Sequence, residues 1–112
     1  MTIQEFKTKL QENTTVAFSD TMQVIEDNYK FTPTAFTNGT IENKAGENSG
    51  SCKLFAFAKL QKLSKAETLA CFGEHYQNVL EDANGDAHQN IRNFMQTGFD
   101  GLNFNGEALA LK

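Results

Sequence analysis

Gly46-Glu47-Asn48-Ser49-Gly50-Ser51-Cys52-Lys53-Leu54-Phe55-Ala56-Phe57-Ala58 is the stretch around which we expect the rest of the chain to be arranged. A polar loop with two glycines runs directly into a segment that has almost no polar face. At about 100° per residue, the apolar side chains from Leu54 to Ala58 cover most of a helical wheel. A short helix this apolar packs on several sides, so we expect a central helix that ends near Leu60. A buried strand is the alternative that periodicity leaves open.

The polar loop before this helix allows two interpretations. Ser49 or Ser51 is the expected N-cap, because a serine hydroxyl can accept a hydrogen bond from an N–H group of the first turn. The second interpretation is a small anion or phosphate pocket over residues 48–52, since a helix N-terminus carries free N–H groups and a partial positive charge. We favour the simple cap, because nearly every helix needs one and few helices bind anions. The Gly-Lys-Ser/Thr ending of a P-loop is missing.

Length and composition exclude several classes of protein. The 112 residues predict one domain, and ten phenylalanines without a tryptophan predict a largely aromatic core. The net charge is -4 and Arg92 is the only arginine, so the chain has no basic patch for nucleic acid. No apolar run reaches membrane-spanning length, and the N-terminus lacks the features of a secretory signal. Two cysteines do not form a disulfide framework. We therefore expect a cytoplasmic protein that does not bind membranes.

The first third of the chain predicts two helices. Residues Thr2–Glu5 match the S/T-x-x-E capping box, so a helix is expected over roughly residues 3–12. Residues 14–18 are β-prone and predict a brief strand. Ser19 is the expected N-cap of the second helix, whose apolar stripe continues to Tyr29. Pro33 disfavours helical geometry at residue 32 and ends this helix.

The middle of the chain predicts a hairpin and the longest helix. Asn38-Gly39 is a strong two-residue hairpin signal, with arms at residues 35–37 and 40–42. Ser64–Glu67 is a second capping box, and it opens a helix expected over residues 65–81. Gly73 lies inside the apolar face of that helix, where it would allow another helix to approach closely.

The last third predicts a short helix and a second hairpin. Asp86–Gln89 resembles a third cap, and the helix that follows should end at Gly98. Asn105-Gly106 predicts a hairpin between residues 102–104 and 107–109. Helices and strands that are separated along the chain predict an α+β fold. We expect a single domain over residues 1–112, with about five helices and a small, mostly antiparallel sheet.

Each of the two cysteines lies in a pattern that is typical of a reactive or metal-binding site. Cys52 lies at the start of the central helix, where the helix dipole can lower a thiol pKa, and His75 or His88 would have to serve as its base. A buried structural cysteine is the interpretation that we favour. Cys71 and His75 have the i, i+4 spacing of two metal ligands, but zinc needs three or four. We therefore predict no metal site, no cofactor and no specific catalytic residue.

A pair of polar residues near the C-terminus completes the candidate site. His88 and Arg92 are also spaced i, i+4, and a guanidinium suits carboxylate or phosphate. The simpler role for Arg92 is to hold a carboxylate or backbone carbonyls, and we favour it. If the chain has a small-molecule pocket, we expect it to be formed by Asn48, Ser49, Ser51, Cys52, His88 and Arg92.

Asparagines inside a helix need a separate explanation, because asparagine is a poor residue for a helix interior. Asn90 and Asn93 lie in the last predicted helix, whereas Asn38 serves a turn. We hypothesise that Asn90 and Asn93 bridge to the loop around residues 43–49. All three asparagines are expected to have structural polar roles.

Four long motifs in order resemble the HopJ type III effector family. They lie at residues 29–39, 46–58, 69–76 and 88–98, so the resemblance spans nearly the whole chain. One departure is Phe99, where much of the family is expected to have tryptophan. The resemblance implies a bacterial protein without an established activity, cofactor or catalytic residue, and the name alone allows secretion by a type III system.

Three functions follow as expectations. The first is a small binding or interaction domain for an unknown protein or a small anionic ligand, as a monomer or homodimer. The second is an enzyme that uses Cys52 or His88. The third is a translocated effector that acts on host proteins. The capped helix expected at the N-terminus differs from the disordered, serine-rich start of most export signals.

Overall fold

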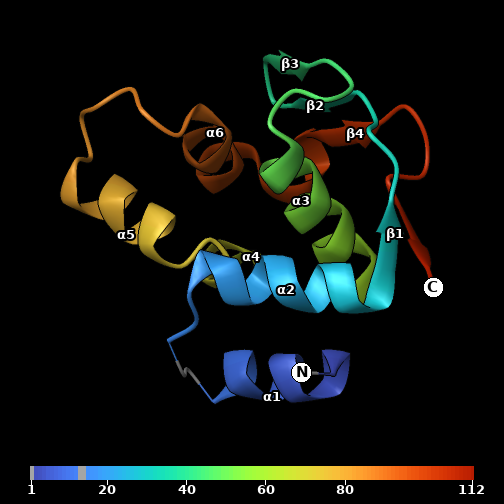
Figure 1. The fold of residues 1–112 in the computed structure, drawn as a ribbon. Coiled ribbons are helices and arrows are strands. Elements are labelled where there is room, and N and C mark those ends of the chain that lie inside the picture. Colours follow the sequence, from blue (N-terminus) through green and yellow to red (C-terminus); the bar gives the residue numbers. More distant parts are fainter. Residues whose placement is uncertain (1, 13–14) are drawn as a thin grey trace.

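The central helix lies in the middle of the fold, with the other helices and two small sheets around it (Figure 1). The computed structural model describes residues 2–12 and 15–112. Within these residues the α-helices are α1 (Ile3–Gln11), α2 (Phe18–Asn28), α3 (Ser49–Gln61), α4 (Lys65–Ala70), α5 (Glu74–Glu81) and α6 (Gln89–Thr97). The other elements are β1 (Tyr29–Phe31), β2 (Phe36–Asn38), β3 (Ile41–Asn43), the 3₁₀ helix η1 (Gly98–Gly101), β4 (Leu102–Phe104) and β5 (Leu109–Leu111).

Helix α3 is buried on several sides, as its sequence predicts. Every residue from Leu54 to Ala58 is buried. Phe55 meets the rings of Phe36, Phe72 and Phe94, which come from β2, the α4–α5 turn and α6. Phe57 points elsewhere and makes edge-on contacts with Phe6 of α1 and Tyr29 of β1. Two phenylalanines of one helix therefore connect most of the elements to one aromatic core.

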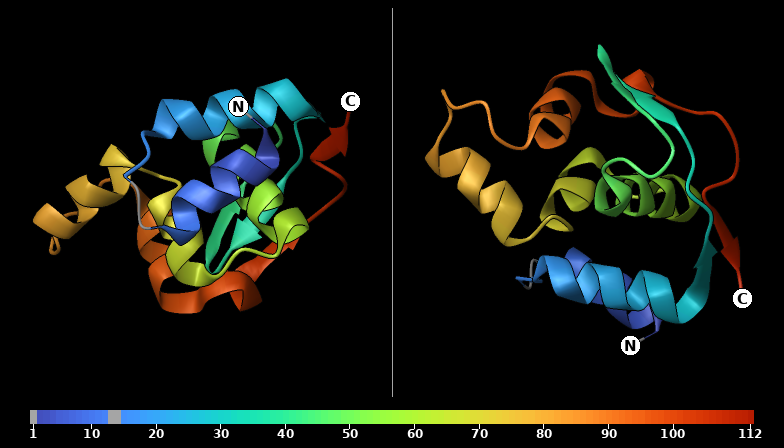
Figure 2. Two further views of the ribbon diagram at one scale, coloured as in Figure 1. Left: turned by 90° about the horizontal axis from the view of Figure 1, so that it is seen from below. Right: turned by 45° about the horizontal axis from the view of Figure 1, so that its top comes forward.

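The strands form two antiparallel sheets. One sheet has the order β3-β2-β4, and the other pairs β1 with β5. Asn38 pairs with both Ile41 and Leu102, so β2 is the middle strand of the larger sheet. The two views of Figure 2 show that β1 and β5 lie beside one end of α3 and that α5 extends away from the sheets. The expected α+β fold class is therefore confirmed, with the antiparallel strands divided between two sheets.

Several local predictions are confirmed. Thr2 and Ser64 each cap a helix through a complete capping box. The Asn38-Gly39 hairpin forms, with its arms one residue later than expected. Gly98 ends α6, as the glycine signal indicates.

Three predictions about the first helices are wrong. Residues 15–17 form no strand, and Thr14 lies outside the described residues. The N-cap of α2 is Ala17, not Ser19; the Ala17 N–H donates to Asp20 and the Phe18 N–H to Glu74. Helix α2 also ends at Asn28, before Pro33, because the next three residues pair with β5.

The expected helix over residues 65–81 is interrupted. Gly73 has φ 57° and ψ -126°, which is not helical, and it separates α4 from α5. A Cβ atom at this position would lie 2.6 Å from the Phe18 backbone nitrogen and 2.8 Å from the Val16 carbonyl oxygen. Gly73 does allow a close approach, as predicted. The segment that approaches is the one that leads into α2, and the predicted helix is broken at Gly73.

The predicted C-terminal hairpin does not form. Strand β4 pairs with β2 and β5 pairs with β1, so the Asn105-Gly106 bend carries the chain from one sheet to the other. An Asn-Gly pair predicts a bend in the chain. It does not determine which strand each arm pairs with, because that pairing depends on side chains in other parts of the fold.

Candidate functional site

Helices α3 and α6 begin in an unusual way. Their N-cap residues, Asn48 and His88, have left-handed backbone geometry with φ 49° and 57°, and neither side chain caps its helix. The expected cap at Ser49 or Ser51 is therefore wrong. The stretch Asp86–Gln89 contains the N-cap residue of α6, His88, but makes no side-chain cap. In a helix the first N–H groups have no intrahelical acceptor. Within the described residues no acceptor is found for those of Ser49–Ser51, Gln89 and Asn90.

A cluster of asparagines joins these two helix starts. Asn43 Oδ1 accepts hydrogen bonds from Asn48 Nδ2 at 2.7 Å and from Asn90 Nδ2 at 3.1 Å. Asn38 Nδ2 donates to the carbonyl oxygen of Asn90 at 2.7 Å, and Asn93 Nδ2 donates to that of Asn38 at 2.9 Å. A single side chain, that of Asn43, thus holds the first turn of α3 against the first turn of α6.

This asparagine cluster is buried and nearly complete in its hydrogen bonding. Asn38, Asn43 and Asn90 are all buried. Among the described residues, Asn38 Oδ1 is the one buried side-chain atom without a partner. Buried polar groups are normally paired, because an unpaired one costs free energy. The cluster can therefore accept one further hydrogen-bond donor.

An arc of rings lies beside the start of α3. The His75 and His88 ring centroids are 5.2 Å apart, and His75 also meets the edge of Phe18 at 4.8 Å. A Cβ atom on Gly50 would lie 3.0 Å from the Phe18 ring, so this glycine allows Phe18 to pack against the first turn of α3. Phe18 therefore contacts both His75 and the first turn of α3.

Arg92 supports the loop between α5 and α6. Its guanidinium donates to the carbonyl oxygens of Asp82 at 2.9 Å, Ala83 at 3.2 Å and Ala87 at 2.5 Å. Its distance to the Asp82 carboxylate is 4.0 Å. The three carbonyls accept from Nε, Nη1 and Nη2 of Arg92, and His88 follows directly after this loop. Arg92 thus positions His88 by fixing the loop.

The two cysteines are free thiols, and both are buried. Cys52 Sγ lies 3.5 Å from the carbonyl oxygen of Thr34. Burial raises the pKa of the Cys52 thiol, although the hydrogen bond to Thr34 opposes this. Burial raises the pKa of Cys71 to about 12. Desolvation of the thiolate is the larger of the two effects on the pKa of Cys52.

We predict slow alkylation of both thiols in the folded protein. At pH 8 a raised pKa leaves little thiolate, so iodoacetamide should react at least about tenfold more slowly than after unfolding. For Cys71 the folded-state pKa of about 12 exceeds the unfolded value of about 8.5, so its stabilising contribution is complete below about pH 8.5 and is lost as the pH rises toward 12. Mass spectrometry of alkylated protein measures both rates. Rapid labelling of Cys52 below pH 8 would contradict this account.

The structure brings together only part of the expected pocket. Asn48, Ser49 and Ser51 lie at the start of α3, and His88 lies at the start of α6. The side chains of Cys52 and Arg92 have other partners. Sequence reasoning missed Phe18 as a neighbour of this site, and it named Asn43 and Gly50 only as members of the polar loop. His75 was considered as a base for Cys52 and as a metal-ligand partner of Cys71, but not as a neighbour of His88. Its position beside His88 depends on the break at Gly73.

No group of three His, Cys, Asp or Glu side chains in residues 2–12 and 15–112 could hold a metal ion. Over the same residues, no helix has the length and apolar character needed to cross a bilayer.

Two comparisons with known proteins give matches. The family model described as HopJ type III effector protein matches residues 3–109. A solved structure, described as the crystal structure of unknown function protein VPA0580, is 52% identical in sequence with a TM-score of 0.97. That alignment covers 100% of this chain and 95% of the other. No curated protein matches the chain.

Proposed function

The chain belongs to the HopJ type III effector protein family, and we propose that it acts as a small binding domain for a compact anion. The proposed site is the junction of α3 and α6, which we define as residues Asn48–Ser51, His75 and His88–Asn90. One observation carries this proposal: Asn43 holds together two helix starts whose first N–H groups lack an acceptor in the described residues.

The backbone supplies the attraction at this junction. Free N–H groups and the partial positive charge of a helix N-terminus favour an anion, each by about 0.3–1 kcal/mol at an exposed site. The hydroxyl groups of Ser49 and Ser51 and the imidazoles of His75 and His88 add donors nearby.

The charge of the protein limits the size of the ligand. The chain carries a net charge of -4, and Arg92 is committed to backbone carbonyls. Long-range steering of an anion is therefore unfavourable, and binding depends on short hydrogen bonds. A compact oxyanion such as inorganic phosphate fits this requirement better than a large polyanion.

An enzyme that uses Cys52 is disfavoured by the geometry. The thiol is buried with a raised pKa and its contact is with Thr34, not with a histidine. The family description favours a different second function, a translocated effector that acts on host proteins. Export of a reporter fused to the first twenty residues by a type III system is the experiment for that function.

We predict that inorganic phosphate stabilises the folded protein. A ligand at ten times its Kd adds about 1.4 kcal/mol, or a rise in Tm of roughly 5 °C. The variant His88→Gly should lose at least half of this rise, because glycine keeps the left-handed cap and removes the imidazole. Differential scanning calorimetry measures the effect, with sodium chloride at equal ionic strength as the reference.

Lys62→Gly is the matched control for this experiment. Lys62 is also a left-handed residue, with φ 54°, but it lies at the other end of α3. Its replacement removes a positive charge, so a response to overall charge alone would reduce the phosphate effect there too. The proposal would be overturned if chloride and phosphate stabilised the protein equally. It would also be overturned if His88→Gly and Lys62→Gly lost the same share of the stabilisation by phosphate.

A further inference from the structure

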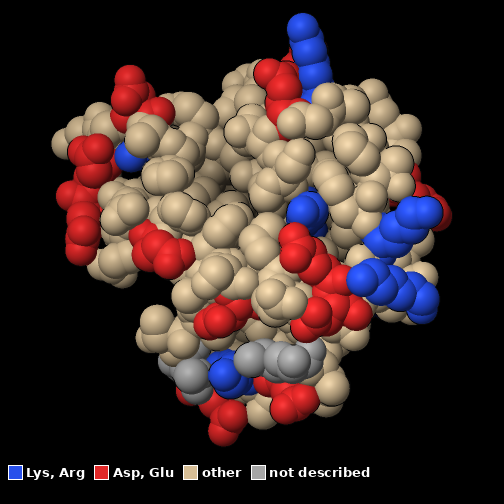
Figure 3. All heavy atoms as spheres, viewed as in Figure 1, with Lys and Arg blue, Asp and Glu red and all other residues tan. Residues whose placement is uncertain are grey.

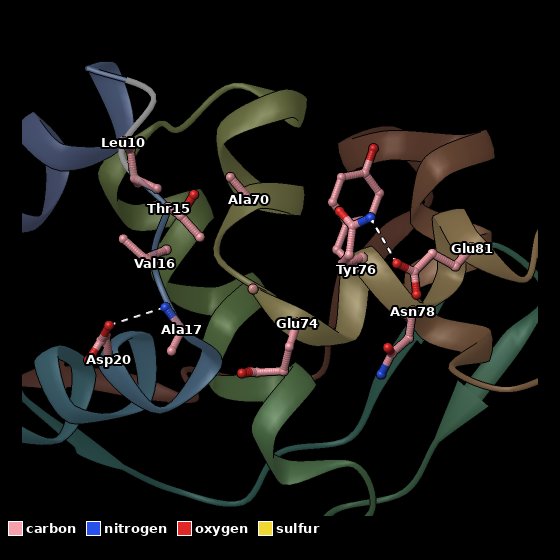
Figure 4. A pocket seen from close by; sticks show the side chains of 12 residues that line it. Leu10, Thr15, Val16, Ala17, Asp20, Ala70, Glu74, Tyr76, Asn78 and Glu81 are labelled. Atoms are coloured by element: carbon pink, nitrogen blue, oxygen red, sulfur yellow. Dashed lines mark hydrogen bonds between the residues drawn. The ribbon is translucent and has the colours of Figure 1, made fainter.

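A separate cleft opens between α5 and the segment that joins α1 to α2 (Figure 4). Its volume is about 770 Å³, within the range of sites for small organic ligands. In the space-filling view the surface is indented below the lobe formed by α5, and acidic side chains gather over that lobe (Figure 3). The cleft shares no residue with the α3–α6 junction.

The walls of this cleft are mainly apolar. Leu10 and Val16 come from the α1 side and face Tyr76 of α5 across the opening (Figure 4). Ala17 and Ala70 line the cleft between them. Tyr76 is only half-buried, so part of its ring is available to a ligand. An aromatic or alkyl group would bury apolar surface here, which is favourable by about 25 cal/mol per Å².

Three carboxylates stand around the apolar walls. They belong to Asp20, Glu74 and Glu81, and no Lys, Arg or His lines the cleft. Asp20 accepts from the Ala17 N–H at 3.1 Å, and Glu74 accepts from the Phe18 N–H at 2.9 Å. Glu81 has only a long hydrogen bond of 3.4 Å from Gln77.

None of these carboxylates has a cationic partner within the described part of the chain, where the ion pairs are Lys53–Glu26 and Arg92–Asp82. The charge in the cleft is therefore of one sign and is not balanced by the protein. A cation on the ligand would supply the missing charge.

We propose that this cleft binds a small organic cation: an amine whose ammonium group faces the carboxylates and whose apolar body lies against Leu10, Val16 and Tyr76. The ring of Tyr76 adds a cation–π surface to the same site. A metal ion would leave the apolar walls unused, and an anion would be repelled by three carboxylates. The inference is independent of the proposed anion site, since the two sites differ in position and charge.

The test compares three probes that share a phenyl ring and a short alkyl chain and differ in charge. They are 2-phenylethylamine, 2-phenylethanol and 3-phenylpropanoate, each titrated into the ¹⁵N-labelled protein and followed by NMR. The amine should bind with a Kd on the order of a few millimolar, as expected for about nine heavy atoms. It should shift the amide signals of Val16, Tyr76 and Gln77. The alcohol should bind at least severalfold more weakly, and the carboxylate should not bind.

Glu81→Gln and Glu42→Gln form the matched pair of variants. Glu81 lines the cleft, whereas Glu42 is exposed on β3, and both changes remove one negative charge. Glu81→Gln should weaken amine binding about threefold, and Glu42→Gln should leave it unchanged. The proposal would be overturned if the alcohol bound as tightly as the amine, or if Glu81→Gln and Glu42→Gln weakened amine binding equally. It would also be overturned if 50 mM amine shifted no amide signal. Dimerisation that covers the cleft and excludes the amine would overturn it as well.

Discussion

Replacing Gly73 with alanine is expected to lower the free energy of unfolding by about 4 kcal/mol, which corresponds to a fall in Tm of roughly 15 °C. The reason is a combination of backbone strain and steric overlap. At φ 57° and ψ -126° an L-residue is strained, and the new Cβ atom would lie 2.6 Å from the Phe18 nitrogen. The nearest atoms belong to the backbone, so no flexible side chain can move aside. Urea denaturation measures the loss.

Gly46→Ala separates strain from overlap. Gly46 has φ 90°, but nothing lies within 4 Å of the position of its Cβ atom. The free energy of unfolding of this variant should fall only by the cost of backbone strain, about 1 kcal/mol. The difference between the two variants therefore measures the close contact of Gly73 with the start of α2. Equal losses would show that this contact is absent.

Asn90→Ala is expected to cost about 3 kcal/mol, because it leaves buried partners without hydrogen bonds. Asn90 Oδ1 accepts from Asn38 at 3.1 Å and from Asn43 at 3.3 Å, and Asn90 Nδ2 donates to Asn43 at 3.1 Å. Because these bonds also hold α6 against α3, the variant should lose part of its stabilisation by phosphate. Chemical denaturation and calorimetry with phosphate give the two readouts.

Asn103→Ala is the control for the loss of an asparagine, since Asn103 is exposed on β4 and should lose at most about 0.5 kcal/mol. A double-mutant cycle of Asn43→Ala with Asn90→Ala should show a coupling energy of about 1 kcal/mol or more. Additive losses at these two positions would mean that the asparagine cluster does not act as a unit.

Local signals in the sequence predicted the parts of the fold that depend on neighbouring residues. The apolar run Leu54–Ala58 predicted the buried centre of α3, and the capping boxes at Thr2 and Ser64 predicted where two helices begin. Asn38-Gly39 predicted a hairpin because a two-residue turn specifies both of its arms. Each of these features is decided within about ten residues of the chain.

Features that depend on tertiary contacts could not be predicted. The periodic apolar pattern continues through Gly73, and only the backbone of Val16–Phe18 shows why the helix breaks there. The Asn105-Gly106 bend gave no information about which strand each arm would join. At the candidate site, the hypothesis that Asn90 bridges to the polar loop identified a contact that the structure contains, to Asn43. The meeting of His75 with His88 required the fold.

A ¹H–¹⁵N NMR titration with inorganic phosphate is the most direct measurement of whether the α3–α6 junction binds an anion. The account predicts that the amide signals of Ser49–Ser51, Gln89 and Asn90 shift together along one binding curve. The first turns of α1 and α4, which Thr2 and Ser64 cap, provide internal controls whose signals should not move. Shifts of equal size in the capped and uncapped helices, or none at Ser49–Ser51, would contradict the proposed function.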